Sequence, residues 1–287
     1  MPNIRDVKYY LLSTFTRIFL GKLRKYHKDE PQLLVFSKDF IGEEVYAYGA
    51  YEKNEIKAIL SSLDFDCSTV TALDIGANIG NHAIQFSYHF KKVICFEPNG
   101  LTFEVLKINT RHTDNVELNN VGLSNKQKSA FLSVPDQNVG GASITSEKNK
   151  GDTAIELRIG DENISEEFGL IKIDIEGHEK EALEGLQRSI AQYKPVICFE
   201  LINTEENAKA LIGSLKGMGY EHFYIPRERG LFGNRSKSFF FTFLNGLFFK
   251  KSQKLVEIKR FDRKFYNLII CEHPDSNYRI KETNVIN

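Results

Sequence analysis

Apolar residues occur along the chain in short, nearly uninterrupted runs that alternate with amphipathic stretches. A run that is apolar on both faces is typical of a strand covered by helices on both sides of a sheet. Apolar positions spaced by three and four residues between the runs predict helices. This alternation predicts an α/β fold with a doubly wound, mostly parallel sheet of the Rossmann-like type. The expected strands are Val70–Ile75, Lys92–Phe96, Val116–Leu118, Leu170–Ile175, Val196–Leu201, His222–Ile225 and Phe265–Cys271. The expected helices are Glu52–Leu63, Ile79–His89, Leu101–Thr110, Glu179–Ile190 and Glu205–Met218.

The first part of the chain does not follow this alternation. Residues 3–26 carry apolar side chains at three- and four-residue steps among basic ones, which predicts a basic helix. Such a helix can lie on an anionic membrane or dock on the protein's own body. We expect short strands in residues 32–47. We therefore divide the chain into an N-terminal region of residues 1–47 and a main domain of residues 48–287.

Two segments inside the main domain also differ from the general pattern. Residues 121–159 are expected to be irregular, with short alternating stretches. Residues 227–264 contain Asn245-Gly246 between two apolar runs, which is a strong signal for a two-residue hairpin turn. We interpret residues 227–264 as an insertion that bears a β-hairpin and lies beside a ligand cleft or forms an interface.

The overall charge argues against nucleic acid as a partner. Lys and Arg together number 38, as do Asp and Glu, so the formal net charge is zero, whereas nucleic-acid binding needs positive charge to replace counterions. The charge is unevenly spread, because residues 1–28 hold seven Lys/Arg and one Asp, and residues 226–264 hold eleven Lys/Arg and three acidic residues. The two basic segments are either solvated faces or places of peripheral membrane contact, through residues 3–26 and 227–264.

Cysteine content, histidine spacing and hydropathy restrict the class of protein further. The four cysteines form no CxxC pair, which argues against a disulfide framework and a structural zinc site. His82 and His89 lack the spacing of metal ligands and are interpreted as ordinary helix residues. The longest apolar run, Phe239–Phe249, is about half of the length that a bilayer-spanning helix needs, and no signal-peptide cleavage site is recognisable. We expect a cytoplasmic protein, at most peripheral on the inner face of a membrane, and leave open whether it is a monomer or a homo-oligomer.

The first strand of the main domain ends in a glycine turn. Asp74 ends an apolar run, and Gly76 and Gly80 follow it with Asn78 between them; glycines at this place allow a ligand to approach the backbone. In open α/β sheets the crevice at the carboxyl ends of the strands binds nucleotides. Glu97, at the end of the second strand, can accept hydrogen bonds from both hydroxyls of a ribose. A dinucleotide requires the GxGxxG spacing and places its pyrophosphate on the helix N-terminus. The acids here favour S-adenosylmethionine, which has no phosphate and carries an ammonium and a sulfonium.

A second group of ionisable residues follows the fourth expected strand. Asp174, Glu176 and His178 come at its carboxyl end, which faces the same crevice, so they are candidates to contact the methyl donor or the acceptor. We choose His178 as the catalytic base because the proton affinity of imidazole suits neutral pH, with Glu176 or Asp174 as alternatives. Asp174 and Glu200 could instead hold Mg²⁺ through carboxylate oxygens. The spacing does not decide whether a divalent metal takes part.

These motifs resemble those of the FkbM family of S-adenosylmethionine-dependent methyltransferases. The resemblance covers the chain from about Tyr48 to Phe199 in the expected order, and its most family-specific part is the segment from Lys172 to Glu179. The matching segments are Tyr48-Gly49-Ala50-Tyr51-Glu52, Asp74-Ile75-Gly76-Ala77-Asn78-Ile79-Gly80, Phe96-Glu97-Pro98-Asn99 and Lys172-Ile173-Asp174-Ile175-Glu176-Gly177-His178-Glu179.

The resemblance implies a class I methyltransferase fold, in which a seven-stranded sheet has one reversed strand near its edge. It also implies O-methylation, often of sugar hydroxyls in glycans and natural products. The chain around Asn120, Val121 and Gly141–Ser143 would flank the adenine of the cofactor. The residues expected to hold S-adenosylmethionine are Asp74, Gly76, Asn78, Gly80, Asn81, Glu97, Asn120, Val121, Ser143 and Asp174.

Together these observations predict an enzyme, an S-adenosylmethionine-dependent O-methyltransferase whose acceptor is a hydroxyl of a saccharide or glycoconjugate. Methyl transfer to an aliphatic hydroxyl needs a positioned base or a divalent metal, because the hydroxyl is a weak nucleophile while it keeps its proton. One alternative is a nicotinamide-dependent oxidoreductase on a Rossmann fold. The other is a non-catalytic scaffold of the same fold, which the acids at the crevice disfavour because burying them is costly.

Overall fold

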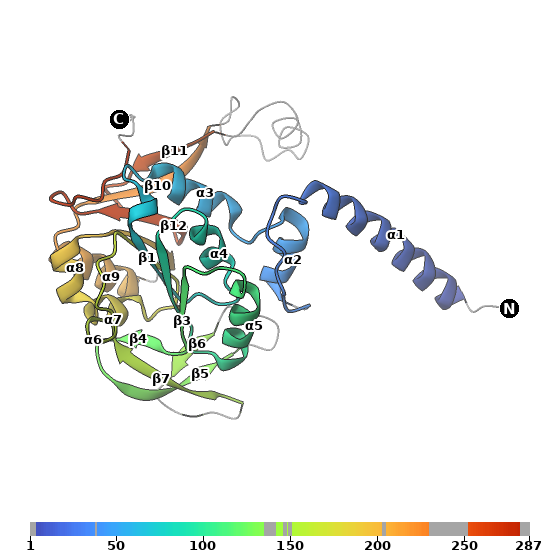
Figure 1. The fold of residues 1–287 in the computed structure, drawn as a ribbon, viewed down its shortest axis with the longest axis horizontal. Helices are drawn as coiled ribbons and strands as arrows, with labels where there is room; N and C mark the ends of the chain where they lie inside the picture. The colour runs from blue at the N-terminus through green and yellow to red at the C-terminus, as the bar shows by residue number, and fades with distance from the viewer. Residues whose placement is uncertain are drawn as a thin grey trace.

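A computed structural model of the 287-residue chain describes residues 4–37, 39–134, 142–145, 148, 151–202, 205–229 and 252–281. The strands of its central sheet are β1 (Thr71–Ile75), β2 (Lys92–Phe96), β3 (Val116–Asn119), β8 (Leu170–Ile173), β9 (Val196–Ile202), β10 (His222–Arg229), β11 (Ser252–Glu257) and β12 (Phe265–Glu272). They form one eight-stranded sheet in the order β11-β10-β12-β9-β8-β1-β2-β3 (Figure 1). Pairing is parallel from β9 through β8, β1 and β2 to β3, and antiparallel at β9-β12, β12-β10 and β10-β11.

The sheet confirms the expected doubly wound, mostly parallel architecture, but the described chain adds one strand to it. Seven strands, with β12 reversed between β9 and β10, match the expected sheet. The additional strand, β11, pairs antiparallel with β10 as far as Arg229 and Ser252. The expected insertion, residues 227–264, therefore leaves and rejoins the sheet as a two-stranded ribbon at its edge. The expected turn at Asn245-Gly246 lies outside the described residues.

Helices cover both faces of the sheet, as the two-sided apolar strands predict. Successive residues of β1 point into opposite cores, because Ala72 packs on one side while Leu73 and Ile75 pack on the other. Each fully buried Leu or Ile side chain stabilises the fold by roughly 1.5–3 kcal/mol relative to an exposed one. The face to which Ala72 points is covered by α3 (Lys53–Ser62), α4 (Asn81–Ser87) and α5 (Gly100–Thr110). The face to which Leu73 and Ile75 point is covered by α7 (Glu179–Glu184), α8 (Gln187–Tyr193) and α9 (Glu205–Gly217). Two shorter elements are the 3-10 turn Cys67–Thr69 and α6 (Gly160–Asn163).

The expected helix Glu179–Ile190 is interrupted, and the chain forms α7 and α8 in its place. A Cβ atom at Gly185, between the two helices, would lie 2.1 Å from the carbonyl oxygen of Ser124. A neighbouring segment therefore crosses the helical stretch at the break. Leu186 and Ile190 still face the same core, so the apolar periodicity continues through the break and could not reveal it.

Residues 32–47 were expected to form short strands, and this expectation is wrong. The described chain forms no strand there, and α2 (Phe40–Tyr48) ends at Gly49, whose φ of 89° is left-handed. Ile41 and Val45, four residues apart, join the same small apolar cluster. The helical spacing, rather than an alternating one, therefore describes this segment.

Residues 121–159 contain a second sheet where an irregular segment was expected. Ala130, Leu132, Ile155 and Leu157 form a small core of its own. The alternating stretches noticed in the sequence correspond to two of its strands, β5 and β7. The sheet has the order β4-β7-β5-β6 and consists of β4 (Gly122–Ser124), β5 (Lys128–Ser133), β6 (Ser143–Thr145) and β7 (Thr153–Ile159).

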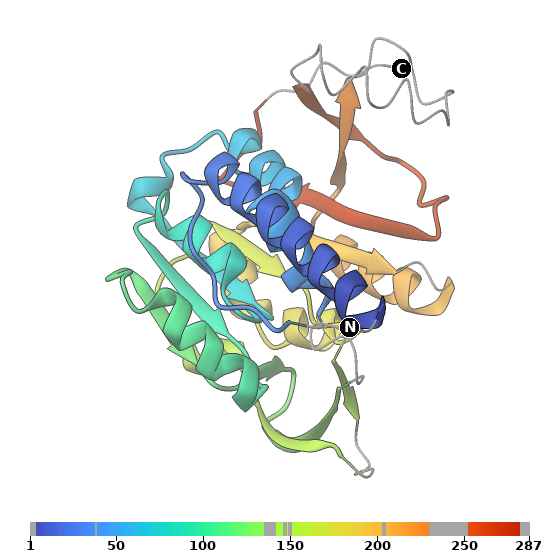
Figure 2. The same cartoon turned by 90° about the vertical axis from the view of Figure 1, so that its right-hand side faces the viewer.

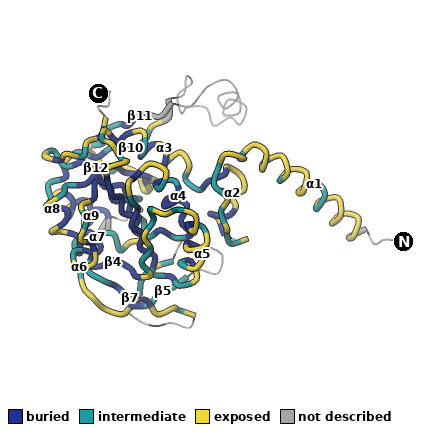
Figure 3. Tube along the Cα trace, viewed as in Figure 1, coloured by how far each residue is buried: buried dark blue, intermediate teal, exposed yellow. Residues whose placement is uncertain are grey.

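The expected N-terminal helix is α1 (Ile4–Tyr26), and it does not dock on the body of the protein. Figure 1 shows it projecting away from the sheets, Figure 2 shows it in front of the body when seen from that side, and Figure 3 shows it exposed along most of its length. Where it ends, Nε2 of His27 lies 2.9 Å from the carbonyl oxygen of Ala47 in α2, and Glu30 forms an ion pair with Lys53. Among the described helices, none is both long and apolar enough to cross a membrane.

Candidate active site

The turn after β1 borders a cavity, and its glycines are needed because protein segments approach it closely. Gly76 has a φ of 82°, and a Cβ atom there would lie 1.9 Å from the carbonyl oxygen of Asp174. Gly80 has a φ of 89°, and its Cβ would lie 2.7 Å from Cδ1 of Leu106. Both glycines thus allow the turn to pack on β8 and α5. Contacts within the protein therefore already require glycine at both positions.

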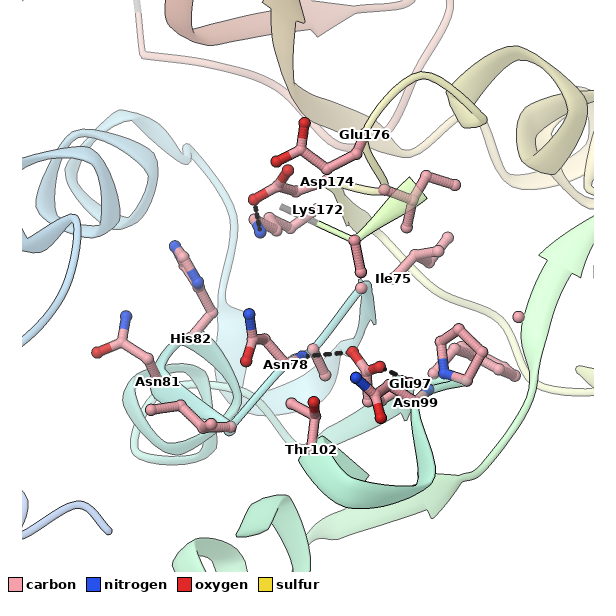
Figure 4. A pocket seen from close by; sticks show the side chains of 18 of the residues that line it. Ile75, Asn78, Asn81, His82, Glu97, Asn99, Thr102, Lys172, Asp174 and Glu176 are labelled. Carbon is pink, nitrogen blue, oxygen red and sulfur yellow. Dashed lines mark hydrogen bonds and ion pairs between the residues drawn. The ribbon is translucent and has the colours of Figure 1, made fainter. Parts of the chain in front are cut away.

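The cavity opens at the carboxyl ends of β1, β2 and β8 (Figure 4). The second sheet contributes Leu132, Ala142 and Ile144 to its wall, and α2 contributes Phe40 and Ile41. Of these five residues only Ala142 was expected, as part of Gly141–Ser143 beside the adenine. The other four come from segments whose structure was predicted wrongly or left irregular. The expected site residues that line the cavity are Gly76, Asn78, Asn81, Glu97, Asp174, Glu176 and Glu200.

Glu97, directly after β2, lies on one side of the cavity. It is 7% exposed, and its carboxylate accepts hydrogen bonds from the backbone N–H groups of Asn78 (2.9 Å) and Asn99 (2.8 Å) (Figure 4). Burial and the charges of Asp74 and Asp174 raise the pKa of Glu97 to about 7, against the effect of the two hydrogen bonds. A carboxylate accepts at about four lone-pair positions, so about two remain for hydroxyl donors. Glu97 can therefore bind a vicinal diol such as that of a ribose.

Carboxylates and a lysine gather on another side of the cavity. Asp174 follows β8, and its Oδ2 lies 3.2 Å from Nζ of the buried Lys172 (Figure 4). Burial by itself would lower the pKa of Lys172, but the charges of Asp174 and of further carboxylates outweigh burial and raise it. Glu200 lines the same cavity, and burial together with the charges of Asp174, Glu52 and Glu176 raises its pKa to about 8. The site thus combines an ion pair with a carboxyl group, Glu200, whose pKa of about 8 is close to neutral pH.

The expected alternative of a Mg²⁺ site at Asp174 and Glu200 gains no support. Among the residues that the structure describes, no group of three or more His, Cys, Asp or Glu side chains is arranged to hold a metal ion. The ammonium of Lys172 already lies beside the carboxylate of Asp174. The protein itself therefore supplies one counter-charge to Asp174.

Asp74 and His178, both expected in the site, do not line the cavity. Asp74 is fully buried in β1, where burial raises its pKa, so it does not contact a cationic ligand directly. Nε2 of His178 lies 3.0 Å from Oγ of Ser124, and its Nδ1 lies 3.8 Å from a carboxylate oxygen of Glu181. These contacts hold the ring between β4 and α7, outside the wall of this cavity.

Of the residues expected beside the adenine, Ala142 lines the cavity, whereas Asn120, Val121 and Ser143 lie just off its wall. Nδ2 of Asn120 donates to a main-chain carbonyl just after β2, and the side chain of Val121 is buried in the core. Ser143 is exposed on β6, whereas its neighbour Ile144 lines the cavity. Adjacent residues of a strand point in opposite directions, so an error of one residue moves a predicted contact out of the site. Gly80 also lies outside the cavity wall, and Gly141 lies outside the described residues.

His82, interpreted from the sequence as an ordinary helix residue, lines the cavity. Its Nε2 lies 3.2 Å from a carboxylate oxygen of Glu52. Burial would raise the pKa of Glu52, but His82 and Lys172 lower it overall. Tyr51 also lines the cavity and is held by Asn81, which accepts from the main-chain N–H of Tyr51 (3.0 Å) and donates to its carbonyl (2.8 Å). The presence of Tyr51 and Glu52 in a family-matching segment was the signal that could have located them.

Thr102 is a further cavity residue that was missed. It lies in the first turns of α5 and is 2% exposed, and within the described structure its Oγ1 has no hydrogen-bond partner. A buried polar group without a partner destabilises a protein by roughly 1–3 kcal/mol. A polar ligand atom beside Thr102 would satisfy this hydroxyl.

We predict that Thr102→Val weakens the binding of S-adenosylhomocysteine by roughly fivefold to tenfold, the value of one ordinary hydrogen bond. The melting temperature should stay unchanged or rise, because valine keeps the shape and removes an unpaired polar atom. Calorimetric titration and thermal unfolding measure the two effects. The control is Thr110→Val in the same helix, where Oγ1 already donates to the carbonyl of Leu106 at 2.8 Å. Equal affinities for Thr102→Val and the natural protein would show that this hydroxyl does not contact the ligand.

The doubly wound sheet, with Glu97 after β2 and further acids lining the crevice at its carboxyl edge, has the architecture of a class I methyltransferase. The sequence comparison agrees with this assignment. The chain belongs to the FkbM family of S-adenosylmethionine-dependent methyltransferases, because the Methyltransferase FkbM domain matches residues 74–222. The family therefore implies S-adenosylmethionine as the cofactor.

Individual relatives are more distant. The chain is 31% identical over 129 residues to the hexuronic acid methyltransferase AglP of Haloferax volcanii, and the match covers 43% of this chain and 53% of AglP. The chain thus spans about half of the length of that relative. A solved structure of the methyltransferase FkbM from Methylobacillus flagellatus KT is 15% identical, with a TM-score of 0.44, over 88% of this chain and 60% of the other. The precorrin-6y C5,15-methyltransferase of Geobacter metallireducens GS-15 is 13% identical, with a TM-score of 0.42, over 83% and 100%.

Proposed function

We propose that this protein transfers a methyl group from S-adenosylmethionine to a hydroxyl group of a saccharide. The observation that carries the proposal is the charge of the cavity. Glu97 lies on one side, and Asp174, Glu176 and Glu200 also line the wall. The cavity therefore suits a ligand that is a nucleoside at one end and a cation at the other.

The residues of the cavity fit S-adenosylmethionine better than a dinucleotide. Glu97 has acceptor capacity left for the ribose hydroxyls, and Thr102 offers a buried hydroxyl without a partner. The acidic wall around Asp174 and Glu176 stabilises an ammonium and a sulfonium, whereas it would repel a pyrophosphate. This disfavours the nicotinamide-dependent alternative. A scaffold without a ligand would gain nothing from these half-buried acids, which disfavours the non-catalytic alternative.

A saccharide is supported as the acceptor by the relative AglP, which is named for a hexuronic acid, and by the polar side chains in this cavity. Tyr51, His82 and Glu200 offer donors and acceptors of the kind that sugar hydroxyls bind. The membership of the chain in the FkbM family supports the methyl group as the group transferred.

When bound, S-adenosylmethionine supplies a methyl group on a cationic sulfur, which a nucleophilic oxygen can displace. The protein has to hold the acceptor hydroxyl in line, remove its proton and exclude water. We assign the proton to a carboxylate oxygen of Glu200, because this group lines the cavity and its raised pKa makes it a better base than an ordinary carboxylate. Asp174 suits this role less well, since Lys172 pairs with it. The apolar side chains of Ile41 and Leu132 help to keep water out.

The test is a transfer assay with the purified full chain, methyl-labelled S-adenosylmethionine and a panel of neutral sugars, hexuronic acids and oligosaccharides. We expect label in a saccharide product and expect it to resist mild alkali, because a methyl ether is stable where a methyl ester of a uronic acid is hydrolysed. Transfer only to acceptors without sugar hydroxyls would contradict the saccharide. Binding of NAD without any binding of S-adenosylhomocysteine would contradict the methyltransferase itself.

A further inference from the structure

The projecting helix α1 is long, and much of its surface is exposed. It runs over 23 residues, Ile4–Tyr26, and extends from α2 into solvent (Figures 1 and 3). The structure fixes its carboxyl-terminal end, through the contact between His27 and Ala47 and the ion pair between Glu30 and Lys53. A helix anchored at one end and otherwise solvated needs something else to stabilise its apolar side chains.

Five of the exposed apolar side chains form one continuous stripe, and Tyr9, Tyr10 and Leu12 are exposed outside it. Val7, Leu11, Phe15 and Ile18 follow each other at four-, four- and three-residue steps, which places them on one face of the helix. They are exposed by 44%, 63%, 68% and 59%, respectively. Phe19, 52% exposed, widens the stripe, and its ring is stacked with that of Phe15 at a centroid distance of 6.4 Å. Side chains of this size are rarely exposed in a continuous row without a binding partner.

Lysines on the same stripe distinguish between the surfaces that could cover it. Lys8 and Lys22 each lie seven residues from Phe15, about two helical turns, and so lie on the same face as its ring. If a second copy of the helix covered the stripe, these ammonium groups would be buried next to each other without counter-charges. On a lipid surface, the long lysine side chains can reach the headgroups while their methylene groups cover apolar surface.

We propose that α1 is an interfacial helix that binds the surface of an anionic lipid bilayer, with the stripe of Val7, Leu11, Phe15 and Ile18 inserted below the headgroups. The charge of the segment fits this partner, because residues 1–28 hold seven Lys/Arg and one Asp. The anchored end of α1 contacts α2, and Phe40 and Ile41 of α2 line the cavity. Binding through α1 therefore holds the α2 side of the cavity close to the bilayer.

The experiment is sedimentation of the full chain with vesicles of phosphatidylcholine alone and of phosphatidylcholine mixed with phosphatidylglycerol. We expect binding to the mixed vesicles that weakens as salt is added. Phe15→Asp should lower the partition coefficient by at least about tenfold, because it removes a large apolar side chain from the lipid. Replacing Lys8 and Lys22 by glutamine should lower it by about fivefold per lysine. The matched control is Ser13→Asp, which makes the same change of charge on the opposite face and should have the smaller effect.

Three results of the vesicle and ultracentrifugation experiments would overturn the proposal. They are no binding to mixed vesicles at low salt, equal losses for Phe15→Asp and Ser13→Asp, and a Phe15-dependent dimer in analytical ultracentrifugation that does not bind vesicles. S-adenosylhomocysteine binding reports the fold of each variant and should be unchanged in Phe15→Asp; its loss would mean that the stripe packs on the body and would also overturn the proposal. Vesicle binding needs neither donor nor acceptor, so its outcome is independent of the proposed reaction.

Discussion

Replacing Glu97 by glutamine will weaken the binding of S-adenosylhomocysteine by about a hundredfold, because hydrogen bonds to a charged group are each worth roughly 1.5–3 kcal/mol. Glutamine has the same size but keeps only one acceptor oxygen, and the backbone N–H groups of Asn78 and Asn99 already bind both oxygens of Glu97. The variant therefore has too few acceptors for a ribose. Isothermal titration calorimetry measures the loss directly.

The matched control is Glu104→Gln in α5, where the carboxylate is mostly exposed and pairs with Lys107. It should bind the ligand as the natural protein does. The free energy of unfolding, measured as a function of pH, tests the burial of Glu97 independently of ligand binding. The pKa of Glu97 is raised from 4.5 to about 7, so its contribution to the free energy of unfolding is fully present below about pH 4.5 and is lost as the pH rises through about 7. Glu97→Gln should lack this dependence. Unchanged affinity in a folded Glu97→Gln protein would contradict the ribose assignment.

Replacing Glu200 by glutamine will lower kcat by a factor of about a hundred or more, the usual contribution of a general base. S-adenosylhomocysteine affinity should change much less, since the base acts on the acceptor. The natural enzyme should become faster as the pH rises towards about 8, because the carboxylate form of Glu200 is the active one and burial raises its pKa to about 8. This limb of the pH–rate profile should be absent in Glu200→Gln.

The companion variant is His178→Ala. We expect near-normal turnover, because the ring of His178 contacts Ser124 outside the cavity wall. Two results together would indicate that His178 is the base. They are a large loss of kcat in a folded His178→Ala protein and an unchanged pH–rate profile in Glu200→Gln. The pair of variants thus compares the base expected from the sequence with the one that the structure supports.

The contrast between Glu97 and His178 shows which site predictions a sequence can support. Glu97 follows directly after a strand of the parallel sheet. The parallel strands of a doubly wound sheet all end at the same edge, and the ligand crevice lies at that edge. The place of Glu97 therefore follows from the local pattern. His178 lies in the turn after β8, and the direction of a side chain in a turn depends on what packs against it. Here Ser124 and α7 hold the ring away from the cavity.

Residues distant in the sequence completed the site in ways that the pattern did not reveal. His82 on α4 meets Glu52 just before α3, and the buried hydroxyl of Thr102 has no hydrogen-bond partner in the described structure. Phe40 reaches the wall only because residues that were expected to be strands form α2. Each of these arrangements depends on packing between separate elements.

The sequence by itself determined the class of fold, the edge of the sheet where a ligand binds, the acidic character of that site and the family of the protein. These properties follow from the two-sided apolar strands and from motifs whose residues are neighbours in the chain, so local rules suffice to predict them. Only the tertiary structure decided that His82, rather than His178, lines the cavity, that Gly76 packs against Asp174, and that α1 projects with its apolar stripe uncovered. Side-chain direction and exposure are set by contacts between distant segments, and no pattern within one segment contains them.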